Sequence, residues 1–401
     1  MIHKSVLPIQ GGFTMADSRF DFDTVIDRRG TDSEKWNKYH DRDVIPLWVA
    51  DMDFCSPPAV ITALHDRVSH GVFGYTHPPG KLVDAVLDHL FRDFDWKVEP
   101  EWLVWLPGLV CGLNLLCRAV GSEGDEVLTF TPVYPPFLSA PGLSRRSLVT
   151  APLLLEGARW VIDFQALERA ITPRSRLLLL CNPHNPVGRV WSRSELEALA
   201  LVAARHDLVI GSDDIHAGLI LDPEKRHLPI AALSPETARR SITLLAPSKS
   251  YNIPGLGCSF AVIPDPELRR AFRATQSGIV PHVNALGYTA ALAAYRDGEG
   301  WRQELLEYLR GNRDLVTEWM GRMPGVAMTH VEATYLAWID ARQLGCEDPV
   351  KFFEAAGVGL SDGADFGGPG FIRLNFGAPR QLLIEALRRM ERAVIEKRRG
   401  C

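Results

Sequence analysis

Six short apolar segments in the middle of the chain alternate with segments of helical periodicity, and this alternation constrains the fold more than any other feature. The segments expected to be strands are 102–106, 126–130, 176–181, 207–212, 241–246 and 258–263. A helix is expected over 192–206, where Ser192 and Glu195 form a capping box, and another over 111–120. Helices between buried strands are typical of βαβ units with a parallel sheet. The sequence therefore predicts an α/β fold.

The last third of the chain differs and predicts a second, smaller domain. Its segments are expected to be long helices over 285–321, strands at 334–340 and 371–377, a helix near 349–356 and a final amphipathic helix. We expect a large domain over 45–284 and a small α+β domain over 285–401. The polar N-terminal segment, 1–44, is expected to pack with the small domain.

Composition excludes several classes of protein. The net charge of −5 comes from well-mixed acidic and basic residues, which indicates neither nucleic acid nor a membrane surface as a partner. The seven cysteines form no CxxC pair, which predicts reduced thiols in the cytoplasm and no metal site. No segment approaches the ~18–20 apolar residues of a membrane helix. The N-terminus lacks the apolar region of a signal peptide, and Met15 is an alternative start.

Residues with useful chemistry follow five of the expected strands. They are Gly108, Tyr134, Asn185, Asp213 with His216, and Ser248 with Lys249. In an open parallel sheet, ligands bind beyond the carboxyl ends of the strands. We therefore expect these side chains to meet at one edge of the sheet.

This set of groups suits pyridoxal 5′-phosphate (PLP). Lys249 offers an amine for a Schiff base with the aldehyde, and Asp213 a carboxylate that keeps the pyridine nitrogen protonated. Tyr134 can stack on the ring, and Asn185 can donate a hydrogen bond to the ring phenolate. A glycine turn that enters a helix suits the phosphate. A lysine at the end of a buried strand is explained if it holds a cofactor, because a buried free charge is costly.

The chain resembles the class I/II aminotransferase superfamily of fold type I PLP enzymes. Within this superfamily it resembles the cystathionine β-lyase, or C–S lyase, subgroup. The segments that carry the resemblance are FDFDTVIDRRGTDSEKWNKY, PLWVADMDF, HGVFGYT, LLLCNPHNPVGRVW, SDDIH, SKSYNIPGL, EATYLAWID and FIRLNFG. The resemblance covers residues 20–395. It implies a large domain with a mainly parallel seven-stranded sheet between helices, and a smaller α+β domain.

The resemblance also implies a role for each ring-binding residue. Lys249 would be the Schiff-base lysine and the proton shuttle, and Asp213 would pair with the pyridine nitrogen. Asn185 and His216 would bond the ring phenolate, with His216 standing where many relatives have tyrosine. Tyr134 would stack on the ring.

Five further residues take their roles from the resemblance alone. Leu109 and Val110 would give backbone N–H groups, and Ser248 a hydroxyl, to the phosphate. Tyr75 would reach the phosphate of a neighbouring subunit and contribute to its substrate site, which implies a homodimer with shared active sites. Arg373 would hold the α-carboxylate of a small amino-acid substrate, a task that suits the guanidinium fork.

Four positions depart from common patterns. Gly257 stands where many aminotransferases have a phosphate-binding arginine, and Ala246 where a serine is frequent. Both departures resemble the C–S lyase subgroup and argue against a standard aminotransferase. Ser250 and Tyr251 replace the Thr-Phe of the subgroup. Because they flank Lys249, this replacement bears on which substrate is used.

The resemblance implies β-elimination from an S-substituted L-cysteine, with a thiol, pyruvate and ammonia as products. Two alternatives use the same residues: an aminotransferase, and a biosynthetic C–S lyase that acts on a larger cysteine conjugate. A different class would be a binding protein that keeps the fold without turnover. The intact set of Lys249, Asp213 and Arg373 argues against that last class.

Overall fold

A central mixed sheet organises the molecule, whose computed structural model describes residues 19–399. Residues 1–18, with Met15, and 400–401 lie outside this range. The sheet has the strand order β2-β9-β8-β7-β6-β3-β4-β5. Its strands are β2 (Leu103–Leu106), β3 (Glu126–Thr131), β4 (Ser147–Glu156), β5 (Arg159–Ile162), β6 (Ser175–Cys181), β7 (Val209–Asp213), β8 (Ser241–Leu245) and β9 (Ser259–Val262). The inner strands β4, β3, β6, β7 and β8 run parallel, so their carboxyl ends share one edge.

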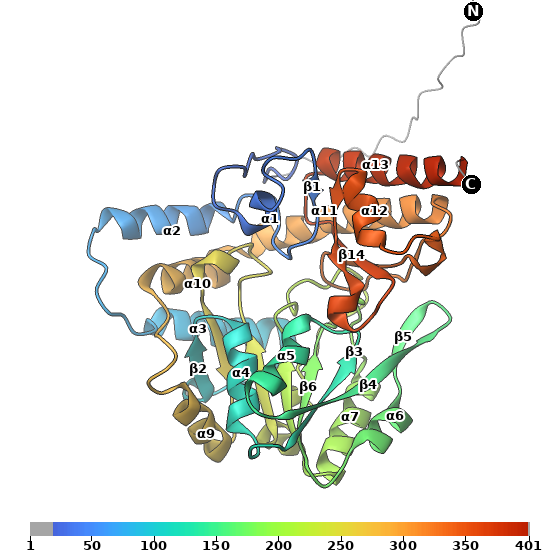
Figure 1. Ribbon diagram of the computed structural model, residues 1–401. Coiled ribbons are helices and arrows are strands. Elements are labelled where there is room, and N and C mark those ends of the chain that lie inside the picture. Colours follow the sequence, from blue (N-terminus) through green and yellow to red (C-terminus); the bar gives the residue numbers. More distant parts are fainter. Residues whose placement is uncertain (1–18, 400–401) are drawn as a thin grey trace, which may run out of the picture.

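Helices cover both faces of this sheet and fill the upper part of the molecule (Figure 1). They are α1 (Glu34–Asn37), α2 (Pro58–Ser69), α3 (Gly80–Phe94), α4 (Leu109–Ala119), α5 (Pro135–Leu143), α6 (Phe164–Ala170), α7 (Arg193–Arg205), α8 (Pro235–Arg239), α9 (Pro266–Gln276), α10 (Ala285–Asp297), α11 (Glu299–Arg322), α12 (Pro349–Ala355) and α13 (Arg380–Arg399). Among residues 19–399, no helix is long and apolar enough to cross a membrane.

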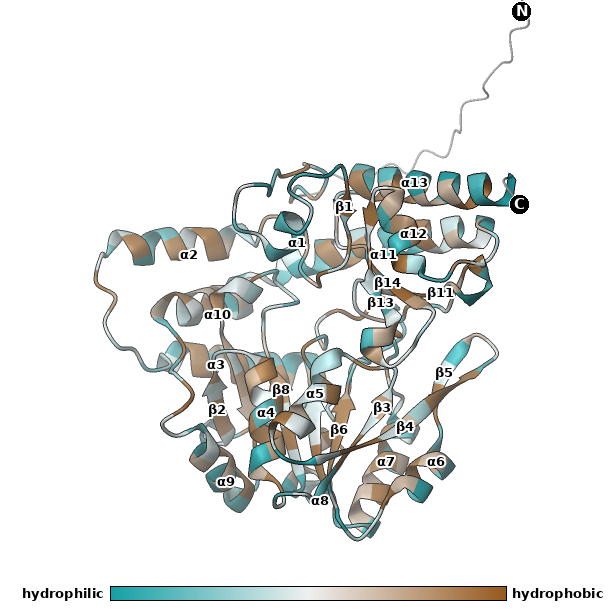
Figure 2. Ribbon diagram, viewed as in Figure 1, coloured by the Kyte–Doolittle hydropathy of each residue, from teal (hydrophilic) through white to brown (hydrophobic). Residues whose placement is uncertain are grey.

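The strand β6 shows why the inner strands read as continuous apolar runs. Leu177 and Leu179 pack into the core on one face of the sheet, and Leu178 and Leu180 into the core on the other. Because both faces are covered, every side chain in the run is buried, as expected for a parallel sheet between two helix layers. The inner strands, such as β6 and β8, are accordingly mostly hydrophobic, whereas β4 and β5 are mixed (Figure 2).

The sheet contains more strands than the sequence indicated. All six expected strands form, but β4 and β5 were not recognised, and the implied seven-stranded sheet has an eighth strand. β4 continues past Pro152 and pairs antiparallel with β5, which adds this strand at the sheet edge. Most side chains of β4 are exposed or half-buried, so its apolar pattern is weak.

A second sheet lies in the upper part of the molecule and carries Arg373. Its order is β10-β11-β14-β13, with β10 (Ala327–Met328), β11 (Leu336–Asp340), β13 (Ser361–Asp362) and β14 (Phe371–Asn375). The N-terminal strand β1 (Ile45–Pro46) pairs in parallel with β12 (Val358–Gly359). Tyr39 and Arg42, which precede β1, donate to Glu354 of α12, so this part of the described N-terminal segment joins the upper part. The division into domains at 45 and 285 stays a prediction.

Candidate active site

The carboxyl edge of the large sheet brings together side chains from four of its strands. Asp213 is the last residue of β7, and Cys181 of β6 pairs with it in register. Asn185 follows β6, and its carbonyl accepts the N–H of Tyr134, which follows β3, at 3.1 Å. Lys249 follows β8. The expected grouping at one sheet edge is thus what the chain forms, because parallel strands end on the same side.

Asp213 is a buried carboxylate without a compensating cation. Its Oδ1 accepts the backbone N–H of Ile215 at 3.1 Å, and no ion pair to it is found within residues 19–399. Burial raises the pKa of Asp213 from its ordinary value of 3.8 to about 7. The site therefore favours either a proton on Asp213 or a cationic N–H group beside it.

Lys249 is held in the site by a backbone carbonyl. Its Nζ donates a hydrogen bond to the carbonyl oxygen of Ala50 at 2.6 Å, and the hydroxyl of Tyr335 donates to the same oxygen at 2.8 Å. Burial lowers the pKa of Lys249 to about 8. A substantial fraction of this amine is therefore neutral near pH 8 and can act as a nucleophile or a base.

Arg373 comes from β14 of the second sheet and meets the sheet edge from the opposite side. One terminal nitrogen donates to Oδ1 of Asn185 at 3.2 Å, and the other donates to the carbonyl of Trp48 at 3.0 Å. Its guanidinium lies 4.6 Å from the ring centre of Phe366. Burial lowers the pKa of Arg373 to about 10, and its Nε has no hydrogen-bond partner within residues 19–399. A buried cation with a free donor fits a carboxylate ligand.

The start of α4 supplies backbone donors at the same edge. Leu109 and Val110 are its first two residues, and no side chain caps their N–H groups. A Cβ atom added at Gly108 would meet no atom within 4 Å, so the turn faces open space. An uncapped helix start beside open space suits an anion such as phosphate. Ser248, which is half-buried, directly precedes Lys249.

His216 is buried beside the site, and its ring lies edge-on to that of Tyr335 at 6.1 Å between ring centres. Its Nδ1 has no partner within residues 19–399. Burial lowers the pKa of His216 to about 3, so the ring is neutral. One buried nitrogen is therefore left for a group that the protein itself does not supply.

Tyr75 is the one expected site residue that stands apart from the others. It lies between α2 and α3, in the loop 71–79, and its side chain is fully exposed. Within a single chain it can serve no site at the sheet edge.

One sequence-based expectation about the surroundings of Lys249, that Ser250 and Tyr251 flank the site, is not what the structure shows. The side chains of Ser250 and Tyr251 are buried and do not line the site. The ring of Tyr251 packs edge-on against Tyr295, and the hydroxyl of Ser250 lies where a Cβ on Gly218 would be. Neighbours of Lys249 in sequence point away from it because the chain turns sharply after β8. In this structure, Ser250 and Tyr251 contribute to packing against Gly218 and Tyr295.

The backbone of residues 48–52 forms one wall of the site, which the sequence analysis did not predict. The segment 48–52 supplies backbone carbonyls to Arg373, Lys249 and Tyr335, and Asn375 donates to the carbonyls of Val49 and Asp51. The hydrogen bonds from this segment to Lys249, Tyr335 and Arg373 are made by its backbone, so they leave no side-chain signal in the sequence. The motif PLWVADMDF was the only sequence signal for it.

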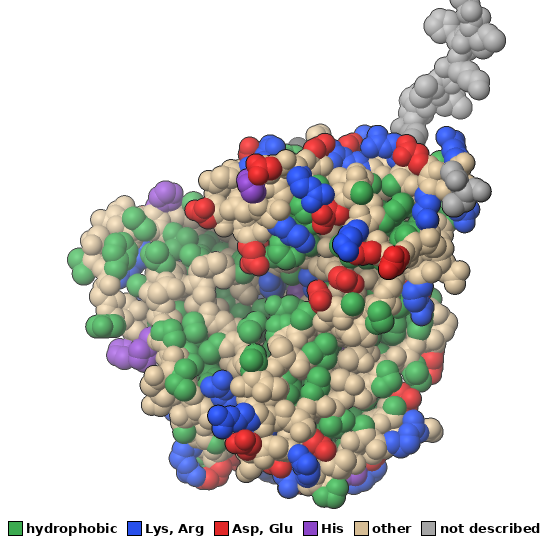
Figure 3. Space-filling model, viewed as in Figure 1, with side chains coloured by type: hydrophobic (Ala, Val, Ile, Leu, Met, Phe, Trp, Pro, Cys, Tyr) green, Lys and Arg blue, Asp and Glu red, His purple; other side chains and the backbone are tan. Residues whose placement is uncertain are grey.

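The donor set fits PLP. The uncompensated Asp213 suits a pyridine N–H, the unpartnered nitrogen of His216 a ring oxygen, and the uncapped start of α4 a phosphate. Lys249 supplies the amine that binds an aldehyde. The molecular surface is hollowed between the upper part and the part with the large sheet (Figure 3), and the site residues come from both parts.

Comparisons with known proteins agree with this site. The family model for aminotransferase class I and II matches residues 42–390. The chain is similar to the protein in the crystal structure of OvoB, with 51% sequence identity and a TM-score of 0.92. The match covers 94% of this chain and 99% of that chain. Cystathionine β-lyase PatB of Bacillus subtilis (strain 168) is 38% identical over 93% of this chain and 99% of its own length.

A third similarity is to cystalysin from Treponema denticola, whose crystal structure contains PLP. It is 32% identical, with a TM-score of 0.91 and coverage of 94% of this chain and 99% of that chain. Each similarity extends over nearly the whole chain, and the family model spans the segments that form the site. The chain belongs to the aminotransferase class I and II family.

Proposed function

We propose that this chain is a PLP-dependent carbon–sulfur β-lyase, which converts an S-substituted L-cysteine such as cystathionine, together with one water molecule, into a thiol, pyruvate and ammonia. The observation that carries the proposal is the meeting of Lys249, Asp213 and Arg373 around one site. The names of the full-length relatives, among them a cystathionine β-lyase, support β-elimination as the reaction.

Each residue has a task in this reaction. Arg373 binds the substrate α-carboxylate with its free donor and so orients the Cα–H bond. Lys249 would hold the cofactor through its amine, and the neutral amine would accept the Cα proton of the substrate. Its lowered pKa favours the neutral amine, and the carbonyl of Ala50 holds that amine in place. Bound PLP withdraws electrons from the substrate Cα, and the carboxylate of Asp213 keeps a proton on the ring nitrogen.

The backbone at Gly257 favours the lyase over an aminotransferase. Gly257 has a left-handed conformation with φ of +57°, and a Cβ there would lie 3.1 Å from the carbonyl oxygen of Pro107. A phosphate-binding arginine would therefore be strained at this position. The phosphate would instead be held by the start of α4, by Ser248 and by a second subunit.

The proposal includes a homodimer in which Tyr75 completes the site of the partner. Its full exposure supports this, as do the exposed side chains of Val72 and Phe73 in the same loop. We also propose that the protein acts in the cytoplasm. The unpaired cysteines support a reducing compartment.

Purified protein loaded with PLP and supplied with L-cystathionine tests the reaction directly. Pyruvate and free thiol should form in equal amounts, and Lys249→Ala should abolish both. The matched control is Lys351→Ala, which removes an exposed lysine of α12 and should leave the rates unchanged.

The same assay can reject the proposal. Transfer of the amino group to an added 2-oxo acid, without pyruvate, would identify an aminotransferase instead. Formation of pyruvate at an unchanged rate by Lys249→Ala would show that this lysine is not the base.

A further inference from the structure

A second buried carboxylate lies directly behind Asp213. Asp214 is the next residue, and its side chain is fully buried. One of its oxygens accepts the hydroxyl of Ser212, and the other lies 2.7 Å from Nε2 of His227. Its backbone N–H donates to the carbonyl of Leu244 at 2.8 Å. Both oxygens and the backbone of Asp214 are therefore held in one geometry.

His227 is equally restrained. Its ring is fully buried and packs edge-on against Phe94, with 5.1 Å between ring centres. Nε2 faces the carboxylate and so carries the proton that it donates, because a carboxylate oxygen is an acceptor. Nδ1 has no partner within residues 19–399. A proton on Nδ1 would be buried there without an acceptor, which favours the tautomer with its proton on Nε2.

The loop that carries His227 is fastened to the sheet edge itself. The side-chain amide of Asn182 donates to the carbonyl of Leu228 at 3.0 Å, and the backbone N–H of Asn182 donates to the carbonyl of Asp213 at 3.0 Å. A movement of this loop would therefore displace Asn182 and, through it, the backbone of Asp213. Asp214 and His227 thus form part of the frame of the site, although neither side chain lines it.

Two adjacent buried carboxylates repel each other unless a proton or a cation lies beside one of them. Within residues 19–399, Ser212 and His227 satisfy the hydrogen bonds of Asp214, and no lysine or arginine pairs with it, so no such cation offsets a charge beside Asp213. A second negative charge favours a positive charge or a proton at the neighbouring position. The charge of Asp214 is one of the causes that raise the pKa of Asp213.

We propose that Asp214, held by Ser212 and His227, is a positioning residue for Asp213 whose buried charge retains the proton on the ring nitrogen of bound PLP. This inference rests on the assignment of Asp213 to that nitrogen, as proposed above. It does not depend on which substrate is used or which bond is broken. Asp214 and His227 touch neither cofactor nor substrate and act through Asp213.

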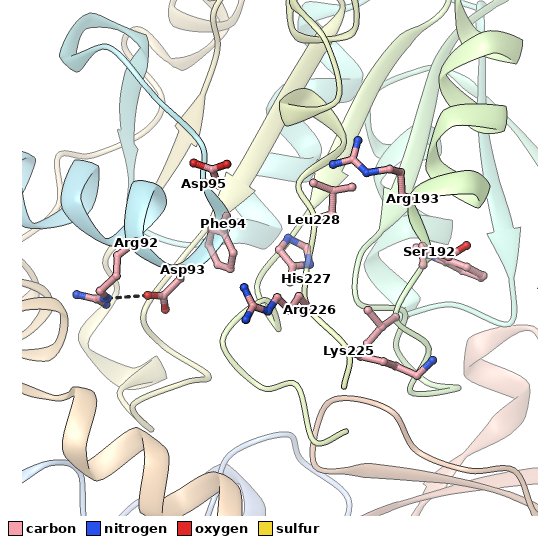
Figure 4. Close-up of a pocket in the computed structure, with 12 residues that line it drawn as sticks. Arg92, Asp93, Phe94, Asp95, Ser192, Arg193, Lys225, Arg226, His227 and Leu228 are labelled. Atoms are coloured by element: carbon pink, nitrogen blue, oxygen red, sulfur yellow. Dashed lines mark hydrogen bonds and ion pairs between the residues drawn. The ribbon is translucent and has the colours of Figure 1, made fainter. Parts of the chain in front are cut away.

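A pocket of about 410 Å³ adjoins His227 and offers a way to test this network chemically. It is lined by the end of α3, the start of α7 and the loop 225–228, and Figure 4 shows His227 among these side chains. A small molecule can reach the space left by a truncated His227 from this side.

The first experiment uses PLP labelled with nitrogen-15 in the ring and measures the chemical shift of that nitrogen in the loaded protein without substrate. Asp214→Asn should move the shift toward the deprotonated value. It should also lower kcat about tenfold or more while KM changes less than about twofold. An unchanged shift and kcat would overturn the proposal.

Two further variants test whether Asp214 has a merely structural role and whether Asp213 is assigned correctly. Asp222→Asn is the matched control, because Asp222 is also a buried aspartate that faces a histidine, His330, away from the sheet edge. It should leave the nitrogen shift unchanged, and the same change in this variant would assign Asp214 a merely structural role. An unchanged shift in Asp213→Asn would show instead that the assignment of Asp213 is wrong.

Chemical rescue covers the case in which Asp214→Asn does not fold. His227→Gly should shift the ring nitrogen in the same direction, and added imidazole should restore both the shift and kcat. A wild-type shift in His227→Gly without imidazole, or an altered shift that imidazole leaves unchanged, would overturn the proposal.

Discussion

Arg373 is a buried cation that binds the protein only through neutral groups. Its contacts are the amide oxygen of Asn185, the carbonyl of Trp48 and the hydroxyl of Ser361. A substrate carboxylate would thus be its only charged partner at the site, among the residues that the structure describes.

Arg373→Lys should therefore weaken substrate binding more than it slows the chemical step. Lysine keeps the charge but loses the planar fork, and hydrogen bonds to charged groups contribute about 1.5–3 kcal/mol each. We expect kcat/KM for cystathionine to fall roughly 10- to 100-fold, mainly through KM, in steady-state kinetics. A fall confined to kcat would contradict the assignment to the carboxylate.

Asp213 should destabilise the cofactor-free protein in a pH-dependent way. Its pKa is 3.8 when exposed and about 7 in the fold, so the folded state binds more protons between these values. The cost of the buried carboxylate is absent below pH 3.8, grows as the pH rises to 7 and is constant above it.

Asp213→Asn removes this cost. The thermal midpoint of the cofactor-free variant should exceed that of the wild type above pH 7, by about 1 °C for each kcal/mol recovered in a chain of this size, and the difference should vanish near pH 4. Calorimetry between pH 4 and pH 8 measures the sign of this difference in thermal midpoint. With PLP bound, the order should reverse, because the variant loses a charged partner of the ring.

At the scale of elements, a cluster of buried charges fastens the N-terminal segment to the wall of the site. Lys35 of α1 is fully buried, and its Nζ lies 2.6 Å from Asp53 and 3.6 Å from Asp51. Arg28 donates to both carboxylates at 2.7 Å. Asp51 belongs to the segment whose backbone holds Lys249 and Arg373, so this cluster ties residues before β1 to the active site.

Asp53→Asn should lower the free energy of unfolding by about 3 kcal/mol, because it leaves the buried Lys35 without its nearest anion. The matched control is Asp43→Asn, which removes an exposed aspartate paired with Arg389 and should cost less than about 1 kcal/mol. Urea unfolding of both variants measures the difference. Equal effects would show that the cluster adds no specific stability.

The helices and strands differ in how clearly they could be predicted from the sequence. β6 and β7 are buried on both faces and appear as unbroken apolar runs. β4 is mostly exposed and half-buried, so it shows neither a run nor a regular alternation. The long helical segment after 285 divides into α10 and α11 at Gly298, where a Cβ would lie 2.8 Å from the ring of Tyr251. That break depends on a contact between residues about 50 positions apart.

At the scale of the whole molecule, the loop between α2 and α3 carries apolar side chains into solvent. Val72, Phe73 and Tyr75 are all exposed there, and Ile279, which precedes α10, is exposed as well. His77 of this loop faces His282 of the α9–α10 connection at 6.2 Å between ring centres, so the two connections lie side by side. We expect this surface to be covered by the second subunit of the proposed dimer.

Phe73→Asp should therefore convert the dimer to a monomer and weaken PLP binding, because Tyr75 would no longer reach the partner. Light scattering after gel filtration, with equilibrium dialysis of PLP, measures both effects. Leu201→Asp is the matched control, since Leu201 is an exposed leucine on α7. A dimer that survives Phe73→Asp with normal PLP affinity would place the interface elsewhere.

The sequence alone determined the parallel sheet, the edge at which the site forms and the identity of Lys249, Asp213 and Asn185 as a set. These properties follow from local apolar patterns and from the shared direction of parallel strands. Only the tertiary structure decided that the backbone of 48–52 forms a wall of the site and that Ser250 and Tyr251 face away from it. It also decided that Asp214 and His227 meet behind Asp213. Contacts between residues distant in sequence, and contacts made by carbonyl groups, depend on how the chain packs and leave no local pattern.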